Sequence, residues 1–442
     1  MSHFYKLIAI AVFAMLCSHT LSASSSIEGT YPLSVEELFK LADANSASIR
    51  SCQIATEVAD AAIADAKALR LPDVEAQLSF SYLGNGSISD RDFSNIAKAD
   101  MPHYGNNFYL KASQPLFAGG AISSQINLAK MGKEMATHQL DAARSEIRFT
   151  LIGYYLQIAM LNNQIAVYEA NIAQTQKVIA QMRIRQKQGT VLKNDITRYE
   201  LQLENLLLQR TRVEDNKKII NHRLVTIVAL PASTIIVPDS TVTTSIPQKM
   251  NEAEWQSLAT QNSPSLRISS LNIDMKREQE RLEKSALLPK IALIAEEHLD
   301  GPITIEVPPI NKNFNYWFVG LGVSYDISSL FKANKKIRTA QISTRKASQE
   351  HTLALENVEN EVQAAYTNYL TSFSDLSTQI KSVELANQNY SVVNNRYNNG
   401  LALITDMTDA ANMKLSAELA LVNSRINVIY NYYNMLFVSH TL

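Results

Sequence analysis

Apolar side chains recur every three or four residues along two long tracts of the chain that contain no proline. The tracts run from Leu116 to Leu230 and from Ile310 to Leu442, and the absence of proline permits long helices. Beyond Gly189 the spacing resumes, so this glycine marks the tip between two antiparallel helices. A helix from Ala121 to Gln188 would be roughly 100 Å long. The first tract follows a coiled-coil seam with one stutter, carried by Leu140, Ala143, Ile147, Leu151, Tyr154, Ile158, Leu161, Ile165, Tyr168, Ile172, Thr175, Ile179 and Met182.

Between these tracts the pattern changes to strict alternation, which is typical of strands with one apolar face. Two β-hairpins are predicted, at about 73–114 and about 290–326. Each strand has about ten residues, the length of a tilted transmembrane strand. The alternative to transmembrane strands is a pair of amphipathic hairpins packed on a soluble core. The transmembrane interpretation is favoured only because the protein is expected to be exported and because the sequence offers no other core. In the last strand Trp317, Val319, Leu321 and Val323 should then face lipid, while Gly320, Gly322 and Ser324 face the other way.

The chain contains the same unit twice, which indicates an internal duplication. Residues 45–50, Asn-Ser-Ala-Ser-Ile-Arg, return at 262–267 as Asn-Ser-Pro-Ser-Leu-Arg, and Leu71-Pro72 returns as Leu288-Pro289. We expect a first repeat at 24–230, a linker at 231–250 and a second repeat at 251–442. Each repeat should contain a helix, a β-hairpin and a long helical hairpin, with tips near 189 and 400.

The N-terminus has the pattern of a secretory signal, with Lys6, an apolar run from Leu7 to Cys17 and small residues toward Ala23. The predicted signal peptide is 1–23, so the mature protein is expected to be exported. No later stretch has about 18 consecutive apolar residues, the length of a membrane-spanning helix.

Four strands cannot close a barrel, and an open edge in lipid would leave backbone groups unpaired. The barrel must therefore be shared between chains. The pattern itself does not choose among two, three or four protomers.

Composition gives no sign of catalysis or of nucleic-acid binding. The chain has 442 residues, with 41 Lys and Arg against 42 Asp and Glu, a formal net charge of −1 that offers no basic surface for phosphates. The eight histidines form no pair at metal-ligand spacing. Neither a nucleophile elbow nor a phosphate-binding glycine loop occurs. We expect no enzyme activity, no metal, no cofactor and no nucleic-acid partner.

The order of the motifs resembles that of the TolC-type outer-membrane efflux proteins over essentially the whole mature chain. The motifs are the duplication, the Leu-Pro before each hairpin, residues 114–120 (Gln-Pro-Leu-Phe-Ala-Gly-Gly) before the first long helix, and Arg-x-x-x-Gly ending at Gly189 and Gly400. Residues 327–334 form a degenerate counterpart without the paired glycines, which leaves the start of the second long helix open.

The resemblance implies a mainly α fold with a membrane β part. It would be a homotrimer with a long antiparallel coiled-coil α-helical barrel as the periplasmic tunnel, and four strands per protomer in a shared twelve-stranded β-barrel. The implied location is the outer membrane of a Gram-negative bacterium, with a large periplasmic part. The implied partners are outer-membrane lipid, a periplasmic adaptor (membrane-fusion) protein and an inner-membrane pump.

The resemblance also assigns roles at the helical tips. A periplasmic gate would use Asp406 and Asp409 as a ring of carboxylates, and Asp195 with Tyr397 as a latch between helices, although Ala402 stands where an arginine occurs in the best-known latch. The alternative for these carboxylates is that they are solvated residues at the start of the returning helix. The apolar tips are candidates for adaptor docking, with packing inside the hairpin as the alternative. The candidates are Gly189, Thr190, Val191, Leu192, Gly400, Leu401, Ala402 and Leu403.

Two functions remain open at this level. The chain is either a passive exit duct of a tripartite efflux pump or type I secretion system, or a structural or adhesive coiled-coil rod anchored by a barrel. The cargo leaves no recognisable pattern in the sequence.

Overall fold

The computed structural model describes residues 29–239, 250–306 and 309–442. The predicted signal peptide and residues 240–249 of the predicted linker lie outside this part of the chain. The described residues form two compact units, the first from residues 29–46, 150–239 and 371–430, and the second from residues 47–149, 250–306, 309–370 and 431–442. Each unit therefore combines segments from both copies of the repeat.

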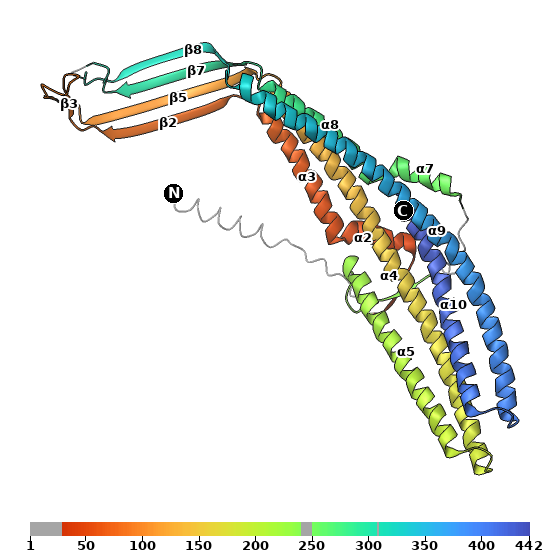
Figure 1. Cartoon of the computed structure of the whole chain (residues 1–442). Coiled ribbons are helices and arrows are strands. Elements are labelled where there is room, and N and C mark those ends of the chain that lie inside the picture. The colour runs from red at the N-terminus through yellow and green to blue at the C-terminus, as the bar shows by residue number, and fades with distance from the viewer. Residues whose placement is uncertain (1–28, 240–249, 307–308) are drawn as a thin grey trace, which may run out of the picture. The chain divides into compact units, whose positions relative to one another are not determined.

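The two copies fold into matching series of elements (Figure 1). The first contains α2 (Val35–Asn45), α3 (Ala47–Ala68), β2 (Asp73–Tyr82), β5 (Tyr104–Phe117), α4 (Ala121–Lys187) and α5 (Lys193–Ile227). The second contains α7 (Glu252–Asn262), α8 (Pro264–Ser285), β7 (Lys290–Gly301), β8 (Phe314–Ser324), α9 (Ser329–Asn398) and α10 (Ile404–Val438).

Each copy opens with two helices rather than the single helix expected from the sequence. The break falls at Ser46 and Ser263, which have extended ψ angles of 123° and 117°. Pro264 begins α8 because the first turn of a helix needs no N–H from that residue. The Ser263 hydroxyl accepts a hydrogen bond from the Leu266 N–H at 3.4 Å, which caps the new helix.

The four main strands form one antiparallel sheet in the order β2-β5-β7-β8. Its central pair, β5 and β7, joins the two copies, with Asn106 opposite Gly301 and Phe117 opposite Ile291. A short hairpin of β3 (Gly86–Ile88) and β4 (Ala97–Ala99) lies within the loop that the sequence left without structure. The outer strands β2 and β8 each have one edge unpaired among the described residues.

Helices of the second unit are connected in the same order as the strands. Lys133 of α4 contacts Asp60 of α3 at 2.5 Å. Asn127 of α4 donates to Glu278 of α8 at 3.3 Å, and Gln341 of α9 donates to Glu280 of α8 at 3.3 Å. The order α3-α4-α8-α9 therefore repeats the order of the strands to which these helices are joined.

The first unit contains a small parallel sheet that the sequence did not predict. Strand β1 (Thr30–Leu33) pairs with β6 (Ile235–Pro238), which lies inside the predicted linker. The hydroxyl of the fully buried Tyr155 donates to the Leu33 carbonyl and accepts from the Asp239 N–H, both at 2.7 Å. Because one buried side chain fixes both strands, this part of the linker is ordered structure.

The two long helices of the copies start in different ways. Gly119 and Gly120, with φ of 61° and 88°, make the turn before α4, and a Cβ on Gly119 would lie 2.6 Å from the Ser285 carbonyl oxygen. The second copy lacks these glycines. There the Asp326 side chain accepts hydrogen bonds from the Ser328 N–H and hydroxyl at 2.9 and 2.7 Å, so a side-chain turn directly precedes α9. None of the helices in the described residues is both long and apolar enough to cross a membrane.

Candidate functional site

One face of the four-stranded sheet is mainly apolar. Directly paired residues of antiparallel strands project to the same face, so the register identifies the members of each face. All four residues predicted to face lipid lie together on this apolar face. Its apolar members are Val74, Ala76, Leu78, Phe80, Tyr82, Phe108, Leu110, Ala112, Ile291, Leu293, Ala295, Leu299, Trp317, Val319, Leu321 and Val323, and its polar members are Asn106, Gln114, Glu297 and Asn315.

The opposite face is mainly polar and carries most of the charge of the sheet. The predicted Gly320, Gly322 and Ser324 belong to it, and aromatic rings of β8 are its chief apolar members. Its polar residues are Asp73, Glu75, Gln77, Ser79, Ser81, Asn107, Tyr109, Lys111, Ser113, Glu296, His298, Asp300 and Tyr316.

The apolar face of the sheet is open in the protomer. Trp317 and Leu321 are 71% and 68% exposed. Water-soluble sheets bury their apolar face. Here both faces of the outer strands β2 and β8 are largely exposed, so the apolar face has no cover within the protomer.

The two helical hairpins end in the same backbone turn. Gly189 and Gly400 have φ of 75° and 73°, the left-handed region in which glycine is unstrained. The Thr190 N–H donates to the Arg185 carbonyl at 3.0 Å, and the Leu401 N–H donates to the Arg396 carbonyl at 2.8 Å. These bonds satisfy carbonyls that the helix ends leave free. The turn geometry explains why glycine recurs at both tips.

An apolar core behind the tips joins the two hairpins. It contains Val178, Ile179, Met182, Val191, Ile196, Tyr199, Tyr397, Ile404 and Met407, with Ala402 packed against it. Among the predicted docking residues, Val191 and Ala402 are thus used for packing inside the protomer. Leu192, Leu401 and Leu403 are instead exposed, as are Gly189, Thr190 and Gly400.

Tyr397 lies in this core, but its contacts differ from those of the predicted latch. Its hydroxyl is buried and has no hydrogen-bond partner among the described residues, so the hydrogen bond expected with Asp195 is not formed in the protomer. The guanidinium of Arg185 instead lies over the ring of Tyr397, 5.6 Å from its centre. An arginine from the first hairpin thereby contacts the second, at a place that the sequence did not indicate.

Two further tyrosines lie near this contact. The hydroxyl of Tyr199 is buried without a partner among the described residues, and Tyr390 accepts a hydrogen bond from Gln174 at 3.3 Å. Burial raises the pKa of Tyr199, and the nearby Tyr390 and Tyr397 raise it further. Burial, and next the charge of Asp195, raises the pKa of Tyr397, while Arg185 acts in the opposite direction. Low solvation thus keeps these phenols neutral.

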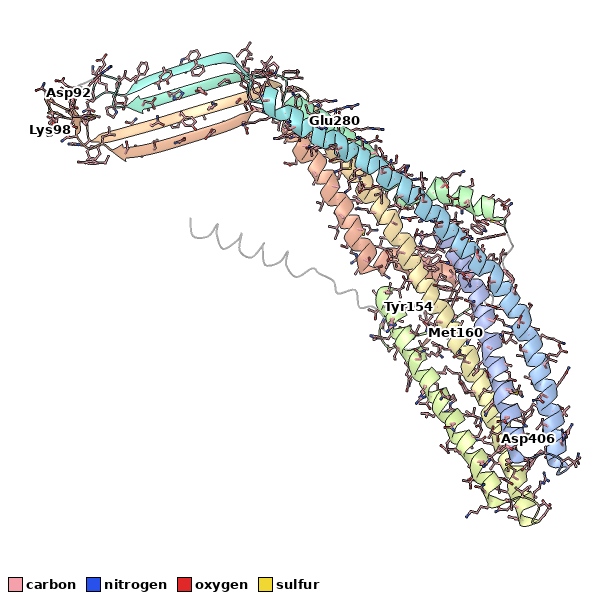
Figure 2. All side chains as sticks on the ribbon, in the orientation of Figure 1. Asp92, Lys98, Tyr154, Met160, Glu280 and Asp406 are labelled. Atoms are coloured by element: carbon pink, nitrogen blue, oxygen red, sulfur yellow. The ribbon has the colours of Figure 1, made fainter. Side chains whose placement is uncertain are left out.

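The predicted gate carboxylates lie at the start of the returning helices. Asp406, labelled near the tip of the second hairpin in Figure 2, accepts a hydrogen bond from the Leu403 N–H at 3.0 Å. It therefore caps α10. Asp409 is exposed in the protomer, and Asp195 is half-buried in the first turn of α5. Asp406 and Asp409 are both exposed in the protomer.

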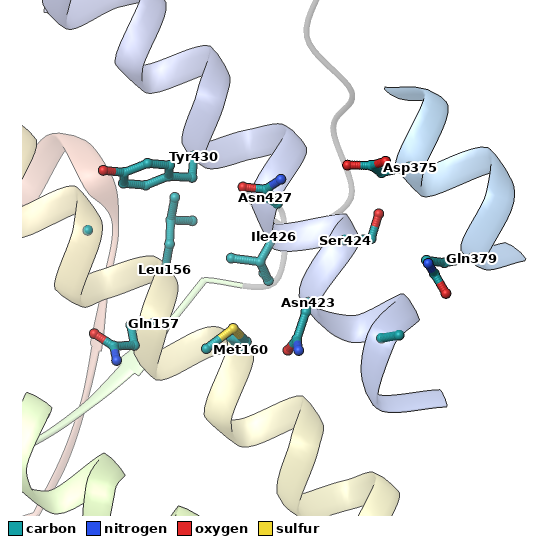
Figure 3. A pocket seen from close by; sticks show the side chains of 12 residues that line it. Leu156, Gln157, Met160, Asp375, Gln379, Asn423, Ser424, Ile426, Asn427 and Tyr430 are labelled. Atoms are coloured by element: carbon teal, nitrogen blue, oxygen red, sulfur yellow. The ribbon is translucent and has the colours of Figure 1, made fainter. Parts of the chain in front are cut away.

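The first unit also contains an open groove of about 670 Å³ between α4, α9 and α10 (Figure 3). Its polar lining consists mainly of amides, Gln157, Gln379, Asn423 and Asn427, and Asp375 is its single carboxylate. No group of three or more His, Cys, Asp or Glu side chains that could hold a metal ion occurs in residues 29–239, 250–306 and 309–442.

Residues 38–229 and 255–432 match the family model described as outer membrane efflux protein. The chain belongs to the outer membrane efflux protein family. Membership places it in the outer membrane, in agreement with the uncovered apolar face of the sheet.

Individual relatives are more distant. The chain is 25% identical over 198 residues to outer membrane protein TolC of Salmonella enteritidis, an alignment that covers 44% of this chain and 39% of TolC. Less than half of the length of that relative is therefore matched.

Solved structures share the fold over nearly the whole chain. VceC, an outer membrane protein of Vibrio cholerae, superposes with a TM-score of 0.72 at 14% identity, covering 92% of this chain and 96% of VceC. CusC gives a TM-score of 0.76 at 14% identity, covering 92% and 91% of the two chains. The outer-membrane channel OprN gives a TM-score of 0.73 at 15% identity, covering 92% and 89%. The predicted combination of long helical hairpins with a four-stranded sheet is confirmed.

Proposed function

We propose that this chain is the protomer of a homotrimeric outer-membrane exit duct. In this proposal the sheet contributes to a shared transmembrane β-barrel, and the helical hairpins form a periplasmic tunnel. Substrates pass through without chemistry at the duct. The energy for transport comes from an inner-membrane pump, which belongs either to a tripartite efflux pump or to a type I secretion system. A periplasmic adaptor protein connects this pump to the duct.

The uncovered apolar face of the sheet is the observation that carries this proposal. A contiguous apolar surface of this extent, open to the surroundings, is stable only against lipid or a protein partner. Its members alternate with polar residues on every strand, as in barrels with a lipid-facing exterior and a wet interior. The unpaired edges of β2 and β8 add support, because in lipid they require pairing with neighbouring chains.

The tips provide the surface proposed for adaptor docking. Leu192, Leu401 and Leu403 expose large apolar side chains at the ends of the hairpins, where solvated polar residues would suffice for a rod that binds nothing. Val191 and Ala402 belong to the core of the hairpin pair and contribute only by holding the tips in place.

The same end of the hairpins is the proposed gate. In place of the expected latch, the Arg185–Tyr397 contact and the apolar core hold the two hairpins together within the protomer. A cation–π contact contributes about 0.5 to 1 kcal/mol when exposed and about 2 when desolvated. Opening would therefore need an external force from adaptor or pump. Asp406 and Asp409, three copies each, would attract cations to the entrance.

The test is reconstitution of the purified protein in planar lipid bilayers. We expect detergent-resistant trimers with discrete single-channel conductance. A monomer that remains in water without detergent, or trimers that do not conduct, would refute the duct. A conducting trimer would also exclude the alternative of an anchored rod without a through-pore.

A further inference from the structure

The first part of α9 carries only positive charge. The buried Ala347 marks the covered side of this helix. On the opposite side Arg338, Ile342 and Arg345 follow one another at spacings of four and three residues, and all three are exposed. Neither arginine forms an ion pair within the part of the chain that the structure describes. The charged residues of α9 within 329–349 are Lys332, Lys335, Lys336, Arg338, Arg345 and Lys346.

Helix α3 presents an exposed face of the opposite charge. Its covered side turns toward α4, where Asp60 pairs with Lys133. Neither Glu57 nor Asp65 has an ion pair among the described residues. Val58, which lies between them along the helix, is 64% exposed. The exposed face of α3 consists of Ile54, Glu57, Val58, Ala61 and Asp65.

These two helices are the ends of the order α3-α4-α8-α9. Helix α3 leads into β2 and α9 follows β8, and β2 and β8 are the strands with one edge unpaired among the described residues. Pairing of β8 with β2 of a second copy therefore brings α9 beside α3 of that copy. The acidic face and the basic face then meet at the same boundary as the two strand edges.

The duplication supplies a template for this contact within one protomer. Asn127 of α4 donates to Glu278 of α8 at 3.3 Å. The ends of α4 and α9 differ by 398 − 187 = 211, which makes Arg338 the counterpart of Asn127. The starts of α3 and α8 differ by 264 − 47 = 217, which makes Ala61 the counterpart of Glu278. Arg338 of one copy would thus lie beside Ala61 of the next.

We propose that the basic face of α9 binds the acidic face of α3 of a second copy. Glu57 and Asp65 lie four residues before and after Ala61, on the same side of the helix, so the Arg338 guanidinium lies between two carboxylates. Ile342, one turn further along α9, packs against Val58. The inference rests on the proposed homotrimer and identifies the side chains that hold its helices together.

The charges also decide which faces can meet. Two copies of α9 repel each other, as do two copies of α3, and like-charge contacts suppress wrong pairings. Only the head-to-tail arrangement places opposite charges together at every boundary. A head-to-tail interface can close into a ring, whereas a symmetric pair of identical faces ends at a dimer. The two faces therefore favour a closed ring with a single direction.

The test is the yield of trimers after refolding in detergent, read on unheated gels. Arg338→Glu with Arg345→Glu makes both faces acidic, and Glu57→Lys with Asp65→Lys makes both basic. Each reversal should lower the trimer yield about five-fold or more, because ion pairs become like-charge contacts at every boundary. All four changes together restore opposite charges and should recover most of the yield. Charges that act only within one protomer would give no such recovery.

Lys276→Glu with Lys336→Glu is the matched control. It also reverses two cations, but these side chains line the groove between α8 and α9. The control should therefore form trimers with the wild-type yield. A loss as large as that of Arg338→Glu with Arg345→Glu would mean that the total charge of the helices matters and the proposed face does not.

Cross-linking identifies the occupant of the basic face directly. Cys52, the free cysteine of α3, is first changed to serine. A short bis-maleimide should then join Val58→Cys of one copy to Ile342→Cys of the next and give covalent dimers and trimers on denaturing gels. Conducting channels whose protomers stay unlinked, or a combined charge variant no better than the separate reversals, would overturn the pairing and leave the duct intact. Wild-type protein that forms no conducting trimers would refute the duct itself.

Discussion

Val319 provides the sharpest test of how the sheet meets the membrane. It is the central residue of β8, lies on the apolar face opposite Ala295, and is exposed in the protomer. If the apolar face contacts lipid, this side chain lies near the bilayer midplane. The change Val319→Arg then places a guanidinium where neither water nor a counter-ion is available.

The cost follows from the depth of the residue. Arginine at the midplane of a barrel exterior destabilises by about 2 to 4 kcal/mol, against about 0 to 1 near the interfaces. Three copies would give about 6 to 12 kcal/mol per trimer if the sites are independent. Per protomer this corresponds to a roughly 30- to 900-fold change in the folding equilibrium.

The assay is folding into lipid vesicles across a urea series, with trimers counted on unheated gels. Phe318→Arg is the depth-matched control, because Phe318 is the adjacent residue, lies on the polar face and pairs with Glu296 across the strands. It should fold at nearly wild-type urea concentrations, since its new charge meets a carboxylate. Equal losses of folding in Val319→Arg and Phe318→Arg would refute the assignment of faces.

Further predictions concern the hairpin tips. Leu403→Asp introduces a favourable N-cap residue before α10, so trimers should persist while export assayed in cells with adaptor and pump falls at least several-fold; unchanged export would exclude docking there. Tyr397→Phe should leave basal conductance unchanged because the hydroxyl has no partner, whereas Tyr397→Ala, which removes about 3 to 5 kcal/mol of packing, should raise it. Asp406→Asn together with Asp409→Asn preserves the cap and should weaken block by multivalent cations, with wild-type block as the contradicting result. The pKa of the Tyr199 hydroxyl is raised in the folded state, so the stabilisation by its neutral form is complete below about pH 10 and is lost as the pH rises further. Tyr199→Phe removes this ionisable group and should therefore reduce the loosening of the tips at alkaline pH, measured by hydrogen exchange.

The regular parts of this molecule were predictable because local patterns determine them. The seam placed a helix from Ala121 to Gln188, and α4 runs from Ala121 to Lys187. Alternation in the last strand separated Leu321 from Ser324, and the register places them on opposite faces. Period and proline position are sufficient for such elements, since each is repeated over many residues.

Two of the unpredicted features depend on contacts between distant segments. Strand β6 exists because Tyr155 fixes it to β1, and nothing in the local sequence from Ile235 to Pro238 indicates that partner. The contact of Arg185 with Tyr397 joins two hairpins, so neither neighbourhood alone predicts it.

The pairing of β5 with β7 has a consequence for biogenesis. Each hairpin of the sheet closes locally, but the ladder between them joins Asn106 to Gly301, on different copies of the repeat. Long-range pairing of this kind is slow, because the chain must lose much entropy before the first bond forms. During synthesis and export the first hairpin must therefore wait for the second with its apolar face and edges uncovered. The nascent chain should depend on a holding chaperone over this interval, and chains truncated before β7 should be degraded rather than inserted.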